Sequence, residues 1–291
     1  MTELRQLVAE ELSLPIDPRV SAMAEAIAKK HGEASRAVLF YGSCLRLTQL
    51  DGLMLDFYLI VSDYRSAYDK SWLAVANRLI PPNVFYFEHE GLVSKYAVLS
   101  EADFAHECSP DAWTVSTAAR FAQPARLVWS ADERARNRAI NTVSEAAPTL
   151  FGWTRPLACE ASIEELWKLA FRQTFHAELR AERLSRPDAL VEADPQRYQR
   201  FGAAALGQSK TSVSRGQAAR WWRRMQRHGK SYSIARLAKA SLTFAGGADY
   251  IAWKINRHTG AGIELKPWQR RHPLLAAITL APRLLRSGAV R

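Results

Sequence analysis

The residues best suited to chemistry lie between positions 38 and 61, which read VLFYGSCLRLTQLDGLMLDFYLIV. An apolar run, 38–41, ends at Gly42-Ser43, where a backbone can turn tightly. A second apolar run, 53–61, carries a single acid, Asp56. A carboxylate inside such a run is costly unless something pairs with it. The segment therefore predicts two strands joined through a Gly-Ser turn, with an aspartate close to that turn.

This arrangement is suited to holding a nucleoside triphosphate and a magnesium ion. The backbone N–H groups of the turn and the Ser43 hydroxyl can donate to phosphate oxygens, particularly where a helix begins. Asp56 can act as a Mg²⁺ ligand, because Mg²⁺ usually takes one or two protein carboxylates together with substrate phosphates. The same residues also fit an ordinary turn followed by a capped strand aspartate, so the pattern alone leaves both interpretations open.

The flanking sequence predicts the elements that would position these residues. Hydrophobic periodicity and helix-start signals indicate helices over 3–14, 18–31, 65–79, 101–108 and 111–121. Short β-branched or aromatic runs indicate strands over 37–41, 53–61, 84–87, 95–99 and 126–129. Strands and helices alternate up to about residue 130, which favours an α+β domain with a mixed sheet flanked by helices.

Beyond residue 130 the pattern is helical. Residues 132–147 and 162–184 have apolar positions at helical spacing, and Ser162 with Glu165 makes a capping box. Residues 186–216, rich in Pro, Asp, Gly and Ser, predict a loop and linker. Three basic helices are expected after it, at 217–226, 234–242 and 249–257. We therefore expect a first domain over 1–130, a helical domain over 131–208 and a basic helical C-terminal region over 209–291.

The positive charge is concentrated in that last region. The chain has a net charge of +11, and residues 209–291 contain 17 Lys and Arg against two acids. This region thus carries +15, which leaves −4 for residues 1–208. A mildly acidic body with a strongly basic end suggests a polyanionic partner, either nucleic acid or an anionic membrane surface.

The cysteines and the apolar segments bear on the compartment. Cys44, Cys108 and Cys159 are far apart and form no CxxC pair, which argues against a disulfide framework or a zinc site and fits a reduced cytoplasm. The N-terminus has no basic segment followed by an apolar one, so we expect no secretory signal. The weakly polar stretch 273–282 is shorter than the roughly 18 residues of a membrane span. The expected location is cytoplasmic, peripheral on the inner face of the membrane.

Several short motifs occur in a fixed order between residues 38 and 128. They are Phe40-Tyr41-Gly42-Ser43, Met54-Leu55-Asp56-Phe57, Phe85-Tyr86-Phe87, Lys95-Tyr96-Ala97-Val98-Leu99-Ser100, Trp113, and Ala119-Arg120-Phe121 with Pro124. In their order and spacing the chain resembles the mitochondrial-type phosphatidate cytidylyltransferases, also called translocator assembly and maintenance proteins. These belong to the nucleotidyltransferase superfamily and make CDP-diacylglycerol for phospholipid and cardiolipin synthesis. The similarity fades in the helical part and is poor in the basic region.

The resemblance implies a nucleotidyltransferase-like domain, a helical domain and a membrane-contacting C-terminal region. It also implies Mg²⁺, CTP and phosphatidate, at an anionic membrane surface and without nucleic acid. Carried over residue by residue, Tyr41, Gly42 and Ser43 would bind the nucleotide and Asp56 the metal. Lys95 and Arg120 would contact phosphate.

The chain departs from the family pattern in two places near the turn. Cys44 stands where the family usually has glycine, which restricts the backbone dihedrals of the turn. Met54 stands at the first position of the D-x-D pair of the wider superfamily, so a second metal ligand must come from elsewhere. Asp51 is the nearest candidate, and Glu88 is another.

The implied reaction is in-line attack of a phosphatidate oxygen on the α-phosphorus of CTP, which expels pyrophosphate. A phosphate monoester has a second pKa of about 6, so the attacking group is already anionic and needs no general base. Positioning and charge neutralisation would carry catalysis. Two alternatives remain open, a nucleotidyltransferase that acts on RNA or protein, and a non-catalytic membrane adaptor with a decayed core.

In one segment of the basic region, two tryptophans stand among arginines. Trp221, Trp222, Arg223 and Arg224 form a pattern suited to a lipid interface with anionic headgroups. The same residues could stack on single-stranded nucleic acid, or place a tryptophan in the core beside a solvated charged face. Residues 273–286, apolar with two arginines, could lie in a membrane surface or dock on the body of the protein.

Overall fold

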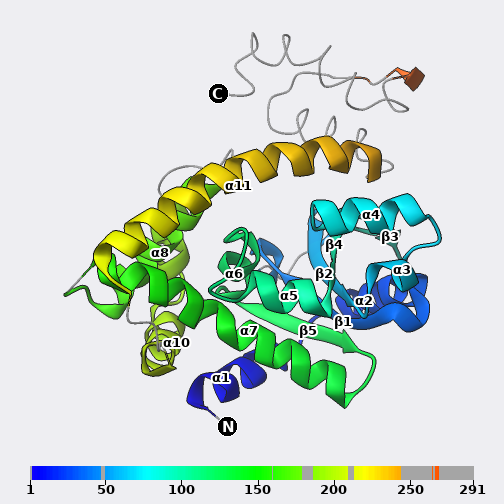
Figure 1. Cartoon of the computed structure of the whole chain (residues 1–291). Coiled ribbons are helices and arrows are strands. Elements are labelled where there is room, and N and C mark those ends of the chain that lie inside the picture. The colour runs from blue at the N-terminus through cyan, green and yellow to red at the C-terminus, as the bar shows by residue number, and fades with distance from the viewer. Residues whose placement is uncertain are drawn as a thin grey trace.

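The structure is a computed structural model that describes residues 2–46, 50–158, 160–178, 186–208, 213–243, 264 and 266–268. In these residues it is an α+β fold with a mixed five-stranded sheet flanked by helices (Figure 1). The strands are β1 (Ser35–Tyr41), β2 (Met54–Val61), β3 (Asn83–His89), β4 (Leu92–Ser100) and β5 (Ala125–Ser130). The helices up to the last strand are α1 (Glu3–Leu12), α2 (Pro18–Lys30), α3 (Tyr64–Ala67), α4 (Ser71–Leu79), α5 (Glu101–Glu107) and α6 (Ser116–Phe121). Those after it are α7 (Glu133–Thr154), α8 (Ile163–Ala177), α9 (Arg186–Glu192), α10 (Pro195–Gln208) and α11 (Arg215–Thr243).

Local sequence fixes several helix starts. The Asp17 side chain accepts a hydrogen bond from the backbone N–H of Arg19, and Pro18 opens α2, where a missing N–H has no consequence. The predicted capping box is confirmed at α8, because Ser162 accepts from the Glu165 N–H and Glu165 accepts from the Ser162 N–H.

The sheet has the order β3-β4-β2-β1-β5, and only β2 and β4 are parallel. The register places Tyr41 opposite Asp56, Asp56 beside Lys95, and Lys95 opposite Tyr86. These four residues therefore form one row across β1, β2, β4 and β3. Because facing residues in a sheet lie on the same side, their side chains share a face.

Each face of the sheet is buried by different helices. On β2, Tyr58 and Ile60 belong to a hydrophobic core shared with α1 and with α5 to α11. Phe57 and Leu59 belong to a second core shared with α2, α3 and α4. Alternation along the strand then puts Asp56 on the same face as Tyr58, toward α6 and α11.

The segment predicted as a loop and linker, 186–216, is largely helical, so that prediction is wrong. It contains α9 and α10 and joins the start of α11. Pro187 and Pro195 lie in the first turns of α9 and α10, where proline is tolerated. The Asp194 side chain accepts from the Arg197 N–H at 3.1 Å. Proline usually interrupts a helix, but here it stands in the first turn of each of these two helices.

Two other helix predictions differ from the structure. The two basic helices expected at 217–226 and 234–242 are one helix, α11, of 29 residues. The helix expected over 65–79 is split into α3 and α4 because Tyr68 is extended and its hydroxyl accepts a hydrogen bond from Asn77 at 3.0 Å. The helix expected over 249–257 lies outside the described residues.

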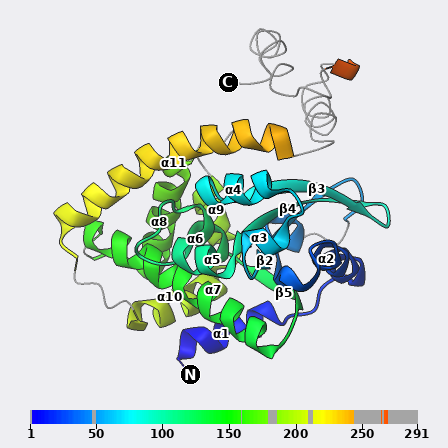
Figure 2. The ribbon, with the colours of Figure 1, turned by 45° about the vertical axis from the view of Figure 1, so that its right-hand side comes forward.

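The larger hydrophobic core runs across the predicted domain boundaries. It joins Leu39 and Tyr58 of the sheet to Phe151 and Trp167 of the helical part and to Trp222 of α11. α11 packs on α8 with one half and on β3 with the other, and both views show it along one side of the molecule (Figures 1 and 2). The boundaries after residues 130 and 208 stay predictions, but α11 is placed to contribute side chains to the sheet face that carries Asp56.

Replacing Gly229 with Ala is expected to loosen α11 and to lower the free energy of unfolding by about 2 kcal/mol. A Cβ at this position would lie 2.1 Å from the Ala177 carbonyl oxygen of α8, a backbone atom that cannot move alone. The matched control is Gly207→Ala in α10, where nothing lies within 4 Å of an added Cβ. That control should be neutral or stabilising by up to about 1 kcal/mol. Urea denaturation of both variants measures the difference, and equal stabilities would contradict the close packing of α11 on α8.

Candidate functional site

The Gly-Ser turn follows β1, as predicted. Gly42 has φ +95°, a conformation that favours glycine, and Ser43, with an exposed side chain, begins a short 3₁₀ helix over Ser43–Arg46. The Leu45 N–H donates to the Gly42 carbonyl at 3.3 Å. Cys44 is buried, is not among the residues with positive φ, and its thiol donates to the Met54 carbonyl at 3.6 Å. The turn thus needs a left-handed backbone conformation at Gly42. Cys44, two residues later, adopts an ordinary conformation and causes no backbone strain.

The carboxylate of Asp56 lies beside this turn and pairs with Lys95. The Lys95 ammonium is 3.1 Å from Asp56 Oδ1. The contact is an ion pair without hydrogen-bond geometry, since Oδ1 is buried and has no hydrogen-bond partner. The Lys95 side chain remains 41% exposed and can move toward an incoming anion. A buried carboxylate oxygen with an unused acceptor site is what a metal ligand requires before the metal arrives.

Tyr41 connects this pair to Arg120. Its ring packs against Tyr58 and Phe121, with ring centroids 5.3 and 6.1 Å away. Burial raises the pKa of the Tyr41 hydroxyl well above its usual value, the nearby Asp56 carboxylate raises it further, and the Arg120 guanidinium partly offsets the increase. The hydroxyl therefore stays protonated, near the Asp56 carboxylate and the Arg120 guanidinium.

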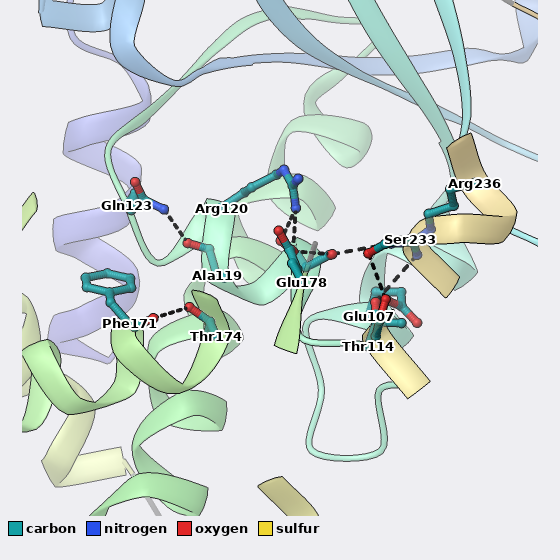
Figure 3. A network of polar contacts seen from close by, with 12 residues as sticks. Glu107, Thr114, Ala119, Arg120, Gln123, Phe171, Thr174, Glu178, Ser233 and Arg236 are labelled. Atoms are coloured by element: carbon teal, nitrogen blue, oxygen red, sulfur yellow. Dashed lines mark hydrogen bonds and ion pairs between the residues drawn. The ribbon is translucent and has the colours of Figure 1, made fainter. Parts of the chain in front are cut away.

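Arg120 is held by a polar network rather than by Asp56 (Figure 3). Its Nη1 donates to the Ser116 carbonyl at 2.7 Å and to Glu178 Oε1 at 3.2 Å, while the Ser116 hydroxyl donates to the same Glu178 oxygen. Burial opposes the charge on Arg120, but the Glu178 carboxylate and the two nearby tyrosines keep its pKa well above the usual value. The guanidinium is therefore a fixed positive charge next to Tyr41.

α11 adds two more cations to this side of the sheet. Arg236 donates to the Pro81 carbonyl at 2.6 Å and to the Ser116 hydroxyl at 3.3 Å, and in Figure 3 it points toward Glu178. Lys239 donates to the Pro82 carbonyl at 2.8 Å and to that of Ile80. Burial lowers the pKa of Arg236, and burial together with Arg236 lowers that of Lys239 to about 7.

Glu107 and Thr114 complete the network on the side away from Arg120. The Thr114 hydroxyl donates to Glu107 Oε2 at 2.7 Å, and the Arg236 Nη2 donates to that hydroxyl at 3.5 Å. Burial raises the pKa of Glu107, and the bond from Thr114 partly reverses the effect. Sequence reasoning missed Glu107, Glu178 and Arg236. Arg236 could have been found, because helical spacing puts it on the same side of α11 as Trp222 and Met225.

The predicted membrane tryptophans are buried, so their assignment to a lipid interface is wrong. Trp221 stacks on Trp153 with centroids 4.8 Å apart, and Trp222 donates from its indole N–H to the Trp153 carbonyl at 3.0 Å. The alternative, core tryptophans beside a solvated charged face, describes both residues. Arg223 and Arg224 are exposed, and their contact with a membrane stays a prediction. Residues 273–286 lie outside the described part of the chain, and in the described part no helix is both long and apolar enough to cross a bilayer.

The second predicted metal ligand is engaged elsewhere in this structure. The Asp51 carboxylate lies 3.3 Å from Arg19 of α2, and Glu88 accepts a hydrogen bond from the Tyr86 hydroxyl. Across the residues that the structure describes, no three acidic, histidine or cysteine side chains gather as a metal cluster. Asp56 alone still fits magnesium, because Mg²⁺ bound with a nucleotide needs few protein ligands. The role of Asp51 stays a prediction.

Neither comparison with known proteins places the chain in a family. A scan against protein-family models and a search of curated proteins both find no match. The geometry of the site brings together Tyr41, Gly42, Ser43, Asp56 and Lys95, and Tyr41 connects Arg120 to them.

Gly42→Ala is expected to displace the turn beside Asp56 while the chain still folds. A Cβ at Gly42 would lie 3.3 Å from Asp56 Oδ2, and φ +95° disfavours any side chain, so the turn must shift away from the carboxylate. We expect a loss of about 1–3 kcal/mol in the free energy of unfolding, and at least a roughly ten-fold weakening of the nucleotide binding that the sequence predicts. Gly52→Ala is the control, with φ +73° and nothing within 4 Å of an added Cβ. Gly52→Ala introduces similar backbone strain but no contact with Asp56. Nucleotide binding that falls equally in both variants would contradict the role of the turn.

Proposed function

We propose that this protein is a magnesium-dependent nucleotidyltransferase that makes CDP-diacylglycerol and pyrophosphate from CTP and phosphatidate at a membrane surface. The observation that carries the proposal is Asp56. Its buried Oδ1 has no hydrogen-bond partner, and it lies next to the Gly42 turn and within 3.1 Å of the Lys95 ammonium. A carboxylate, a mobile cation and a tight turn at one point of a sheet suit an anionic nucleotide better than a neutral substrate.

In the proposed reaction a phosphate oxygen of phosphatidate attacks the α-phosphorus of CTP. The new P–O bond forms as the bond from that phosphorus to the bridging oxygen of pyrophosphate breaks, and pyrophosphate carries away the electron pair. The attacking phosphate is already anionic near neutral pH, so the chain needs no residue to remove a proton. This agrees with the composition of the site, where the basic groups are Lys95 and Arg120.

Three side chains of the site have distinct roles in this scheme. Lys95 leaves Asp56 and contacts triphosphate oxygens, which is feasible because its side chain is 41% exposed. Arg120, fixed by Glu178, supplies a positive charge that does not reorient, and such preorganised charges stabilise charge that develops in a transition state. Tyr41 stays protonated and can donate its hydroxyl to a phosphate oxygen.

Asp56 would hold the magnesium ion, which when bound neutralises phosphate charge and helps to orient the triphosphate. Gly42 and Ser43 would face the same phosphates through their backbone and through the exposed Ser43 hydroxyl. The choice of cytidine and of phosphatidate rests on the motifs at Lys95-Tyr96 and Ala119-Arg120-Phe121, since no group of the described site distinguishes a cytosine.

The test is product formation by the purified chain. With CTP, Mg²⁺ and a short-chain phosphatidate in detergent micelles, we expect CDP-diacylglycerol by mass spectrometry and one pyrophosphate for each lipid formed. The other three nucleoside triphosphates, each labelled at the α-phosphorus, serve as competitors. Transfer from ATP to RNA in place of lipid would overturn the assignment, and so would a folded chain that forms no product with any nucleotide.

A further inference from the structure

A cavity of about 730 Å³ lies on the sheet face opposite Asp56. The end of α2, α3 and the start of α4 border it, and Tyr96 of β4 lines it. Lys95 and Tyr96 are consecutive on β4, so their side chains point to opposite faces of the sheet. Lys95 pairs with Asp56 on the other face. The cavity, which we call the α2–α3 cavity, is therefore separate from the candidate site, and its volume is typical of small-molecule sites, roughly 300–1,000 Å³.

One wall of the α2–α3 cavity is a cluster of rings. His31, Tyr68, Phe85 and Tyr96 pack on one another, with neighbouring ring centroids 5.4–6.4 Å apart. Tyr96 is almost fully buried, whereas the other three are only half-buried. Apart from Leu73 and two alanines, the apolar lining consists of these rings. A wall of rings suits a planar aromatic ligand better than an acyl chain.

His31 holds this wall in place. Its Nδ1 donates to the Ala67 carbonyl at 2.9 Å, and its Nε2 accepts from the Tyr96 hydroxyl at 3.1 Å. Burial lowers the pKa of His31, which favours the neutral ring that this pairing requires. The end of α2, the end of α3 and β4 are thus joined at the cavity, and Figures 1 and 2 both show α2 and α3 next to each other. The cavity is therefore preformed.

Three exposed lysines line the same cavity, Lys29 and Lys30 at the end of α2 and Lys70 directly before α4. The Lys30 ammonium lies 5.4 Å from the centroid of the Phe87 ring, which places it beside the ring cluster. Among the residues that the structure describes, none of the three forms an ion pair. The end of a helix favours cations, but its start disfavours them. Folding thus gives a reason for the two lysines of α2 and none for Lys70.

Acids and hydroxyls complete the polar lining. Glu33 and Asp69 supply carboxylates, and Ser62 and Ser66 supply hydroxyls. A carboxylate repels a phosphate, but it can accept hydrogen bonds from the hydroxyls of a ribose or from the amino group of a base. Three lysines against two acids leave the charged lining positive by one. The cavity therefore offers rings, hydrogen-bond acceptors and unpaired cations to one ligand.

We propose that the α2–α3 cavity binds a nucleoside phosphate, with the base against the half-buried rings and the phosphate between the lysines. Bases stack on aromatic side chains, and lysine ammonium groups bind phosphate oxygens. Inorganic phosphate would engage the lysines and leave the rings without a partner. An acyl chain would do the opposite. The inference goes beyond the proposed function, because this ligand lies on the other face of the sheet from Asp56 and needs no metal there.

The test is equilibrium dialysis of the full-length protein against radiolabelled AMP, GMP, CMP and UMP. EDTA in the buffer keeps magnesium away from Asp56. We expect at least one of these nucleotides to bind in a one-to-one complex. Its nucleoside and inorganic phosphate, each tested alone, should bind at least about ten-fold more weakly. Asp56→Asn should bind the nucleotide as the wild type does, which separates a failure of this inference from a failure of the proposed function.

Two changes to the cavity probe its two halves. Combined Lys30→Gln and Lys70→Gln substitutions should weaken binding about ten-fold or more, because they remove charged contacts with the phosphate. Lys230→Gln is the matched control, since Lys230 is an exposed lysine of α11. Phe85→Leu keeps an apolar side chain but removes the stacking of the base, and should also weaken binding about ten-fold.

A further measurement needs no variant to fold. The nucleotide should shift the NMR signals of the His31 ring, which lies in the cavity wall, and leave those of His228, exposed on α11, unchanged. The proposal is overturned if none of the four nucleotides binds, if inorganic phosphate binds as tightly, or if Phe85→Leu or the double lysine variant keeps its affinity. It is also overturned if Asp56→Asn abolishes binding, if His31 does not respond, or if only an RNA oligonucleotide binds.

Discussion

Asp56→Asn should lower turnover by about a thousand-fold and leave the fold intact. The substitution keeps the shape of the side chain and removes the charge that the proposed metal and Lys95 both require. A loss of several kcal/mol in transition-state stabilisation corresponds to this factor. The stability should change by less than about 1 kcal/mol, because the Lys95 partner is partly solvated and can be hydrated when unpaired.

The control for this variant is Asp111→Asn, an exposed acid in the loop between α5 and α6. It removes one negative charge from the same chain without touching the site, so turnover should stay within two-fold of the wild type, or about 0.4 kcal/mol. Steady-state rates and urea denaturation of both variants give the comparison. Retained activity in Asp56→Asn would exclude Asp56 as the metal ligand and would leave the proposed site without its central group.

Glu178→Gln should lower the free energy of unfolding by about 3 kcal/mol. The Glu178 carboxylate is nearly buried and compensates Arg120, which donates to it at 3.2 Å, and it lies close enough to Arg236 to affect that residue's pKa. Removing the charge leaves the Arg120 and Arg236 guanidinium groups, both largely buried, without the carboxylate that offsets their mutual repulsion. Since Arg120 is also the fixed cation of the proposed site, turnover by the folded fraction should fall as well.

Glu192→Gln is the matched control, because its carboxylate pairs with Lys168 at 3.0 Å on the surface and is 59% exposed. Exposed ion pairs contribute about 1 kcal/mol or less, so this variant should unfold close to the wild type. Chemical denaturation at neutral pH distinguishes the two. If Glu178→Gln and Glu192→Gln unfold at the same urea concentration, the polar network does not compensate Arg120 and Arg236 as described.

Much of the candidate site could be predicted from the sequence because its parts are local. The turn at Gly42 and the strand with Asp56 lie within one segment of 24 residues, 38–61. The register of β2 and β4 then places Lys95, which the resemblance assigned to the same site, beside Asp56. Cys44 stands where the family usually has glycine, yet it does not strain the turn, since the left-handed backbone is needed at Gly42 and not at Cys44.

The remaining parts depend on tertiary packing, which spacing in the sequence does not reveal. Glu178 lies 58 residues after Arg120 and meets it only because α8 ends against α6. Trp221 and Trp222 match a membrane motif by composition, yet they are buried because Trp153 of α7 offers a stacking partner. α9 and α10 were missed because prolines at their starts resemble those of a linker.

Calorimetric titration of the purified chain with CTP, with and without Mg²⁺, tests the central claim most directly. It requires neither lipid nor turnover and reports only on the site formed by Gly42, Asp56 and Lys95. The proposed function predicts binding that depends on Mg²⁺ in the wild type and is lost in Asp56→Asn. Absence of binding in the wild type, or binding of equal strength in Asp56→Asn, would contradict it.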